Sequence, residues 1–301
     1  MVKHILKLIW NQRKANMFLF GELLLVSVFL WYLVDFLYAT SVTYFAPTGY
    51  NIEHTYKIVL DELSERSSKY VSIEERTSTQ GEDLLTVVDR IRNYPGVEAV
   101  SLSSLSHPYT LGFRSGLYRI DTTDIGLNRS QVTPDFFKVF DIKDSKGEIE
   151  PLVNALNQYN TVVLTKDIES EIPSKESMVG KKIYDAQRDS ISYTIGAVAH
   201  SLRKSEYIAA EPYIINLISD DKIAKINEDD EVTYYELCIR VSPDKDIDFP
   251  KRFQKEMSVQ LAVGNLYLQE VQPFYYIRDA YIKDSGARNE VKAQLSIVLF
   301  L

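Results

Sequence analysis

An unbroken apolar stretch near the N-terminus limits what this chain can fold into more than any other feature. The stretch from Met17 to Leu37 consists almost entirely of Phe, Leu, Val, Trp and Tyr. As a helix, its about 21 residues would reach roughly 31 Å, which matches the hydrocarbon core of a bilayer. A buried helix of a water-soluble domain would be shorter or would carry a polar stripe. We therefore predict a transmembrane helix with its boundaries at Met17 and Leu37.

Two acidic residues interrupt this stretch. Asp35 lies near one end, at the level of the headgroups, and Glu22 lies about a turn and a half from the other end. A carboxylate is costly near the bilayer centre and less so near an interface. Two interpretations of Glu22 stay open. Either it is hydrated or protonated close to the headgroups, or it makes an intramembrane helix–helix contact, in which case Glu22→Leu would weaken assembly without affecting insertion.

Charge asymmetry predicts the orientation of this helix. Four basic residues precede it: Lys3, Lys7, Arg13 and Lys14. No acid precedes the helix, and after it no Lys or Arg occurs before Lys57. The positive-inside rule then places residues 1–16, a basic amphipathic segment, in the cytoplasm and the chain from about Tyr44 onward outside. A cleaved signal peptide is the competing interpretation, but the apolar run is too long for an h-region and no clear A-x-A site follows it.

Composition restricts the class of the remaining chain. The 301 residues are 45% hydrophobic and 25% charged, which is ordinary for a globular protein that also has one membrane helix. The net charge of -8 and the lack of a basic stripe argue against nucleic acid as a partner. Cys238 is the one cysteine, so no internal disulfide can form, and its apolar surroundings in the sequence predict a small core residue.

Outside the membrane, the first predicted unit is β–α–β. A β-branched strand begins after His54, and a helix with one apolar face follows from Gly81 to Asn93. Tyr94-Pro95-Gly96 ends this helix, and the alternating run from Val97 to Leu105 predicts a second strand. We assign residues 45–115 to this first part.

A second β–α–β pattern lies near the C-terminus. Strands are predicted at Thr233–Val241 and Leu266–Val271, with a helix at Phe249–Leu261 between them. We assign residues 231–283 to this part. Two such units on either side of a long insertion predict one split α/β sandwich of the α+β class.

The insertion, residues 116–230, is predicted to be a β-rich second lobe. Thr133 before Pro134 predicts a helix N-terminus, and Thr165 is predicted to cap another short helix. The predicted strands are Gly116–Ile120, Thr161–Leu164, a strand at Ile183, Ile191–Val198 and Tyr213–Ile218.

The last residues, 288–301, predict the start of a second transmembrane helix. A charged helical turn leads into the apolar run SIVLFL, which is too short to span a bilayer alone. On this interpretation the sequence is a piece of a longer chain.

No motif predicts catalysis, a cofactor or a metal. The run Gly180-Lys181-Lys182 resembles the end of a P-loop but lacks the earlier glycine and the hydroxyl residue, and G-x-S-x-G does not occur. The four histidines have no metal-binding spacing and are interpreted as surface or turn residues: His4, His54, His107 and His200. We therefore expect a chain without catalytic, cofactor-binding or metal-binding residues.

Several runs, taken in order, resemble a known family. They are Met1–Leu37, Val132–Phe140, Thr161–Thr165, Val179–Ile183 and Tyr193–Val198, followed by the C-terminal amphipathic segment. Each run alone is weak, but their order and spacing extend over nearly the whole chain. The sequence resembles the FtsX/MacB-type permeases of ABC transporters, in the form found in Bacteroidetes-type bacteria.

This resemblance implies a fold and a set of partners. It implies a two-lobed periplasmic domain between two membrane helices, with a porter-like lobe split in sequence and an inserted lobe called the sabre. It implies a dimer with a second permease copy or a paralogue, a separate cytoplasmic ABC ATPase, a periplasmic adaptor and the bilayer of the bacterial inner membrane. The ATPase must be another chain, because no ATPase cassette is fused here.

Three functions remain open from the sequence. The first is a permease subunit of an ABC-type export or lipoprotein-release system that transmits ATPase-driven motion to the periplasm. The second is a membrane-anchored extracytoplasmic sensor or ligand-binding domain, which a cytoplasmic signalling helix after Leu301 would favour over three further spans. The third is an anchored periplasmic enzyme, for which no clustered polar pocket is evident in the sequence. If the chain is a permease subunit, the links between membrane helix and periplasmic lobe are expected at Pro47–Gly49 and Asp284–Lys292.

Overall fold

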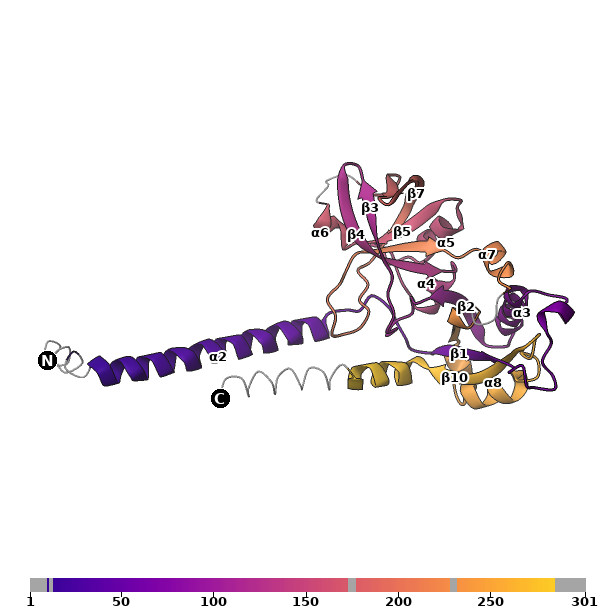
Figure 1. Ribbon diagram of the computed structural model, residues 1–301, viewed down its shortest axis with the longest axis horizontal. Coiled ribbons are helices and arrows are strands. Elements are labelled where there is room, and N and C mark those ends of the chain that lie inside the picture. The colour runs from indigo at the N-terminus through magenta and orange to yellow at the C-terminus, as the bar shows by residue number, and fades with distance from the viewer. Residues whose placement is uncertain (1–9, 11–12, 173–176, 228–231, 285–301) are drawn as a thin grey trace. The chain divides into compact units, whose positions relative to one another are not determined.

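The computed structural model describes residues 10, 13–172, 177–227 and 232–284 (Figure 1). It divides into two units, one containing the N-terminal helix and the other consisting of residues 47–284. Most of the predicted amphipathic segment 1–16 and all of the predicted helix start 288–301 lie outside the described residues.

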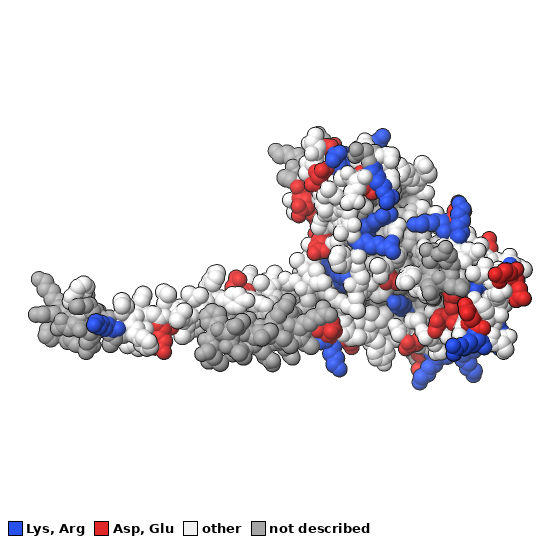
Figure 2. All heavy atoms as spheres, in the orientation of Figure 1, with Lys and Arg blue, Asp and Glu red and all other residues white. Residues whose placement is uncertain are grey.

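The N-terminal helix, α2, runs from Arg13 to Phe45. Its part from Met17 to Phe45 has a mean hydropathy of 2.2 and is long and apolar enough to cross a membrane. Charged side chains are rare on it, whereas the other unit carries many of both signs (Figure 2). The predicted helix is confirmed, but it continues past Leu37 because apolar residues persist until the Pro47 break.

A single ten-stranded sheet organises residues 47–284, in the order β10-β1-β9-β2-β4-β3-β6-β7-β5-β8. The first four strands in this order are β10 (Leu266–Pro273), β1 (Thr55–Glu62), β9 (Glu236–Val241) and β2 (Val97–Ser104). Each is antiparallel to its neighbour, so strands from the two predicted β–α–β units alternate. The two units are thus parts of one structure, although they are far apart in sequence.

Two helices supply the core of this end of the sheet. Helix α3 (Gln80–Arg92) begins with a capping box between Thr79 and Glu82, and α8 (Phe249–Met257) follows β9. Leu84 and Ile91 of α3 join Phe253 of α8 in one buried cluster with strand side chains. Cys238 lies fully buried in β9, as predicted, and burial raises the pKa of its thiol.

The other six strands form a closed ring. They are β3 (Ser115–Ile120), β4 (Thr123–Val132), β5 (Thr161–Thr165), β6 (Lys182–Asp185), β7 (Arg188–Ala199) and β8 (Tyr213–Leu217). A parallel pairing of β4 with β8 closes the ring around an apolar cluster that includes Ile120, Leu127 and Ile195. The ring joins β2 through only two residue pairs, Ser103–Val132 and Ser104–Gln131. The boundaries 116–230 of an inserted lobe remain a prediction.

Short helices complete this unit. They are α4 (Phe136–Val139), α5 (Glu150–Asn157), α6 (Ile168–Glu171), α7 (Asp220–Ala224) and the 3-10 turns Ile73–Glu75, Val232–Tyr234 and Pro243–Lys245. Because residues 232–234 turn in this way, the strand predicted from Thr233 begins only at Glu236.

Both predicted threonine caps are wrong, for the same physical reason. The hydroxyl of Thr133 accepts a hydrogen bond from the Leu102 N–H at 3.0 Å, and α4 begins after Asp135 instead. The hydroxyl of Thr165 accepts one from the Tyr213 N–H at 2.9 Å, and α6 begins after Asp167. In both cases the threonine hydroxyl accepts from a neighbouring strand instead of from the first turn of a helix. The local sequence does not reveal that strand.

Candidate functional site

Two short segments connect residues 47–284 to the rest of the chain. The first connector is residues 47–54, which follow α2, and the second connector is the helical segment 274–284, which follows β10. Both contact the same two loops, residues 105–114 and 200–212. We call the contacting side chains the junction: Tyr50, Tyr109, Glu206, Arg278 and Tyr281.

The first connector is held mainly through its backbone. The Arg203 N–H donates to the Thr48 carbonyl at 3.0 Å. Gly49 has a φ of +85°, and a Cβ atom there would lie 2.1 Å from the Ser201 carbonyl oxygen. Only glycine combines this conformation with so close an approach, so the turn after α2 is fixed against the 200–212 loop.

A single arginine fastens the end of the first connector to the sheet. Arg240 of β9 donates from its Nη atoms to the carbonyls of Asn51 at 2.8 Å and Glu53 at 3.1 Å. Its Nε is also shared between the carbonyls of Lys138 and Val139 at 3.1 and 2.8 Å. The planar guanidinium thus joins three chain segments with charge-assisted hydrogen bonds.

The second connector is held mainly through side chains. Phe274 is fully buried, and its ring packs edge-on against Phe140 at 5.1 Å and His107 at 5.5 Å between centroids. One turn further, the Arg278 Nε donates to Glu206 Oε1 at 2.6 Å. Beyond it, the Tyr281 ring lies 5.8 Å from the Tyr109 ring. The face of this helical segment that carries Phe274, Arg278 and Tyr281 is therefore attached.

Tyr109 is the centre of the junction. Its hydroxyl donates to Glu206 Oε1 at 3.0 Å, and its ring packs edge-on against Tyr50 at 5.9 Å. Its φ is +64°, an uncommon conformation for a bulky residue, and it persists because the Tyr109 N–H donates to the Lys204 carbonyl at 3.1 Å. Tyr109 thereby touches one residue of each connector and two of the 200–212 loop.

The pKa shifts at the junction favour an ionised Glu206 and neutral tyrosines at neutral pH. Burial alone would raise the pKa of Glu206, but hydrogen bonds from Arg278 and Tyr109 outweigh it and the pKa is lowered. Burial raises the pKa of Tyr109 to about 12, and it also raises the pKa of Tyr50. At neutral pH, an ionised Glu206 therefore lies between the Arg278 cation and the neutral Tyr109 phenol. This arrangement holds the segments in place and does not form an acid–base pair.

A buried polar network fixes the 105–114 loop to strand β9. Glu236 of β9 accepts hydrogen bonds from the Ser103 hydroxyl and the Ser106 N–H, both at 2.9 Å. The His107 Nδ1 lies 2.6 Å from the Pro108 carbonyl, and its Nε2 lies 3.3 Å from the Lys57 ammonium. Burial lowers the pKa of His107, and the Glu236 carboxylate, 3.3 Å from Nε2, opposes this shift.

His107 corrects one sequence interpretation. It lies in a turn, as predicted, but it is only 5% exposed and is not a surface residue. His54 pairs with Asp246 at 2.8 Å, and His4 lies outside the described residues. Within the described ranges, no three His, Cys, Asp or Glu side chains come together as a metal site.

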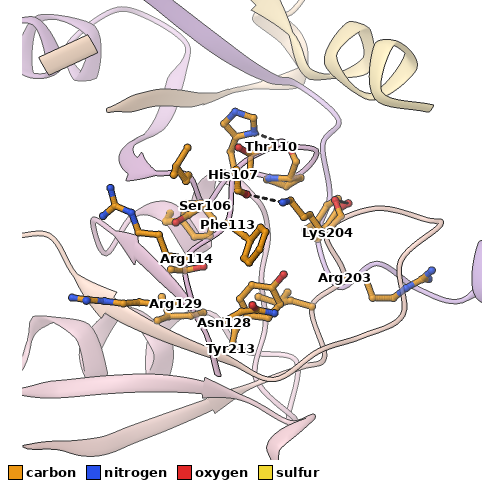
Figure 3. Close-up of a pocket in the computed structure, with 18 of the residues that line it drawn as sticks. Ser106, His107, Thr110, Phe113, Arg114, Asn128, Arg129, Arg203, Lys204 and Tyr213 are labelled. Carbon is orange, nitrogen blue, oxygen red and sulfur yellow. Dashed lines mark hydrogen bonds between the residues drawn. The ribbon is translucent and has the colours of Figure 1, made fainter. Parts of the chain in front are cut away.

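The cavity beside the junction is too small for a substrate (Figure 3). It measures about 50 Å³, and Phe113 and Tyr213 lie at its centre. The Lys204 ammonium is directed inward and donates to the Gly112 carbonyl at 2.6 Å. Such a space holds a few waters at most, so we interpret it as a packing defect of the loop rather than a ligand site.

The residues singled out from the sequence lie elsewhere. Met17, Glu22 and Leu37 all belong to α2, and a contact of Glu22 with a second membrane helix remains a prediction. Sequence reasoning missed Tyr109, Glu206 and Arg278 as a group. The sequence signal for them is the mixed polar and aromatic composition around Tyr109. The three residues are far apart in sequence, so nothing local indicates that they come together.

Comparisons with known proteins give structural likenesses alone. No family model and no curated protein matches the chain. The chain is similar to solved domains of membrane permeases and ABC-type transporters, and these are proteins of the kind that the sequence resemblance names. One is a domain assigned to a permease protein from Porphyromonas gingivalis, at 15% identity and a TM-score of 0.45, covering 73% of this chain and 90% of that one.

Two further structures belong to named transporters. The periplasmic region of MacB from Actinobacillus actinomycetemcomitans is 12% identical with a TM-score of 0.43, and the match covers 73% of this chain and 90% of that one. The extracellular domain of the noncanonic ABC-type transporter YknZ from Gram-positive bacteria is 13% identical with a TM-score of 0.40, and the match covers 71% of this chain and 100% of that one.

Proposed function

We propose that this chain is a permease subunit of an ABC-type export or lipoprotein-release system and that it transmits ATPase-driven motion to a domain in the periplasm. In this proposal the chain itself is not catalytic and a separate cytoplasmic ATPase hydrolyses ATP. The N-terminus is cytoplasmic, residues 47–284 are periplasmic, and two permease copies or paralogues form the dimer, with a periplasmic adaptor as a further partner.

One observation carries the proposal: both connectors of residues 47–284 are attached at the same junction. If each connector leads to a membrane helix, relative movement of the two helices acts directly on Tyr109 and Glu206. An enzyme that is merely tethered has no need for such a joint, whereas a device that passes on motion does. The apolar helix α2 and the basic residues before it support the membrane topology.

We also propose a division of labour within residues 47–284. The split lobe, 45–115 with 231–283, contains both connectors, and the inserted lobe, 116–230, contains the ring of six strands. Backbone pairing between β2 and β4 is limited to two residue pairs, but a buried apolar cluster also joins the ring to β2 and β9 through Val132, Ala99 and Cys238, so a displacement of the split lobe would be passed on to the ring. The motion would then start at the junction and displace the inserted lobe.

Co-purification tests the class of function. The membrane-embedded protein is extracted in mild detergent and isolated through an affinity tag. We expect an ABC ATPase with vanadate-sensitive hydrolysis to accompany it. A histidine kinase or another signalling protein in its place would overturn the permease assignment and favour the sensor.

A spin-label measurement tests the transmission. A cysteine at Tyr159, which is 98% exposed, reports the distance between two copies, while the buried Cys238 stays unlabelled. We expect nucleotide binding by the ATPase to shift this distance, and Arg278→Gln to reduce the shift without loss of the ATPase. Arg119→Gln removes an exposed ion pair with Asp124 in the ring and serves as the matched control. An unchanged shift in Arg278→Gln would contradict the proposed role of the junction.

A further inference from the structure

A large groove runs along the outer side of the second connector. Its volume is about 990 Å³, at the upper end of the range for ligand sites, and every residue that lines it belongs to residues 47–284. It is lined by the helical segment from Tyr275 to Asp284, by the end of β10, by the start of α8 with the preceding turn and by the 109–111 loop.

The walls of the groove are rich in tyrosine. Five tyrosines line it: Tyr56, Tyr109, Tyr275, Tyr276 and Tyr281, of which the first two are buried behind the surface. Tyr275 and Tyr276 are 53% and 61% exposed, and their rings lie 4.3 Å apart. Leu111, which is 77% exposed, and Pro273 add apolar surface. Rigid aromatic walls with hydroxyl tips are the kind of surface that binds extended peptide segments.

The charge of the groove is one-sided. Four carboxylates line it, namely Asp246, Asp248, Glu270 and Asp284, against one cation, Lys251. Asp246 already accepts from Tyr56 and pairs with His54, so it is part of the wall. Asp248 is exposed, and no described side chain neutralises it. Tyrosine faces combined with carboxylates favour a guanidinium or ammonium group, by cation–π and ionic attraction.

We infer that this groove binds an extended, lysine- or arginine-bearing segment of a partner protein. The inference deepens the proposed function, because it names the chemistry of a periplasmic partner of the permease. It also places that partner in contact with Tyr281, which belongs to the junction and packs on the buried Tyr109. A bound segment would therefore restrain the second connector. A second copy of this acidic chain fits the groove less well, because its charge has the same sign.

Peptide selection tests the chemistry without any ATPase. The whole chain, in nanodiscs of phosphatidylcholine, is panned with a random peptide library displayed on phage. We expect enriched peptides to contain an excess of Lys or Arg, and their affinity to fall as salt is raised. Failure to enrich any peptide, or enrichment of acidic or uncharged peptides, would overturn the inference.

Variants tie the binding to the groove. For an enriched peptide measured by fluorescence anisotropy, Asp248→Asn combined with Glu270→Gln should weaken binding roughly tenfold, and Tyr276→Ala roughly fivefold. Asparagine tolerates the positive φ of Asp248, so the backbone is preserved. Glu169→Lys on α6 and Tyr159→Ala are matched controls that should leave binding unchanged. Equal binding by the groove variants and the controls would refute the assignment. Because no ATPase is present, this result is independent of the co-purification test.

Discussion

The two connectors are attached to residues 47–284 in different ways. The first is held through its own backbone groups, by the close packing of Gly49 on the Ser201 carbonyl, by the Arg203 N–H and by the Arg240 guanidinium. The second is held through its own side chains, by the buried Phe274, by the ion pair of Arg278 with Glu206 and by the ring contact of Tyr281 with Tyr109. The difference indicates that the first connector is rigidly attached and that the second can shift when its side-chain contacts change.

Removal of the arginine that fastens the first connector should have the largest effect. Arg240→Met leaves three carbonyl groups, those of Asn51, Glu53 and Val139, without this donor, whereas the Lys138 carbonyl keeps a backbone donor, and we expect a loss of about 4 kcal/mol of unfolding free energy. Thermal unfolding followed by circular dichroism in detergent measures it. Arg252→Met is the control, because this half-buried side chain also donates to two backbone carbonyls, those of Ile247 and Lys245. Equal shifts in Tm for the two variants would remove the distinction between fixed and adjustable connectors.

A glycine pair separates backbone strain from close packing. Gly49→Ala should destabilise by about 2 to 3 kcal/mol, because both its φ and the Ser201 carbonyl exclude a Cβ. Gly147 has nearly the same φ, +84°, but nothing within 4 Å of a Cβ, so Gly147→Ala should cost about 1 kcal/mol. The difference between the two urea midpoints gives the part of the destabilisation that is due to contact between residue 49 and the 200–212 loop. Identical midpoints would show that the turn at Gly49 is not pressed against it.

Loss of the ion pair at the second connector should be milder. Arg278→Gln should cost about 1 to 2 kcal/mol, since Glu206 is mostly buried and would lose its cation. The matched exposed pair, removed by Arg119→Gln, should cost at most about 0.5 kcal/mol. Hydrogen exchange of residues 274–284 is the local measurement, and we expect faster exchange there with little change in residues 47–54. Equal acceleration in both connectors would contradict their independence.

Acid should loosen the second connector first. The pKa of Glu206 is below its ordinary value of 4.5 in the folded chain, so its contribution to stability is complete above that value and is lost as the pH falls through the lower, folded pKa. Unfolding midpoints measured downward from neutral pH should therefore decline in this window, and the decline should be smaller in Glu206→Gln. An identical pH dependence in both proteins would show that Glu206 does not contribute.

The smallest effect is expected in the groove. Tyr275→Ala removes an exposed ring that packs mainly on Tyr276, so the unfolding free energy should change by no more than about 0.5 kcal/mol. Thermal unfolding of the same preparation checks it. A loss of several kcal/mol would show that the tyrosine wall is a structural element of the second connector rather than an open surface.

Periodicity in the sequence predicted most elements of the fold. The strands at Val97 and Leu266 and the helix from Gly81 are found within a residue or two, because their apolar faces repeat with the period of the element. Alternation alone could not predict that β9 lies between β1 and β2, since pairing depends on partners far along the chain. The same limit explains the two misplaced threonine caps.

The junction could not be predicted from the sequence. Tyr109, Glu206 and Arg278 have no common motif, and each looks like an ordinary loop or helix residue in its local context. Their association depends on the conformation of two loops, one of which requires a positive φ at Tyr109. Such a conformation is determined by tertiary contacts, which local propensity does not encode.

The place of β1 between β9 and β10 has a consequence for biosynthesis. Thr55–Ile58 cannot pair with β9 until the ribosome has made the chain as far as Val241, and cannot pair with β10 until it has reached Pro273. Until then, this strand has at least one open edge, the condition that favours aggregation of a nascent chain. We therefore expect this unit to mature late, after translation of its last strand, and to depend on a chaperone during the delay.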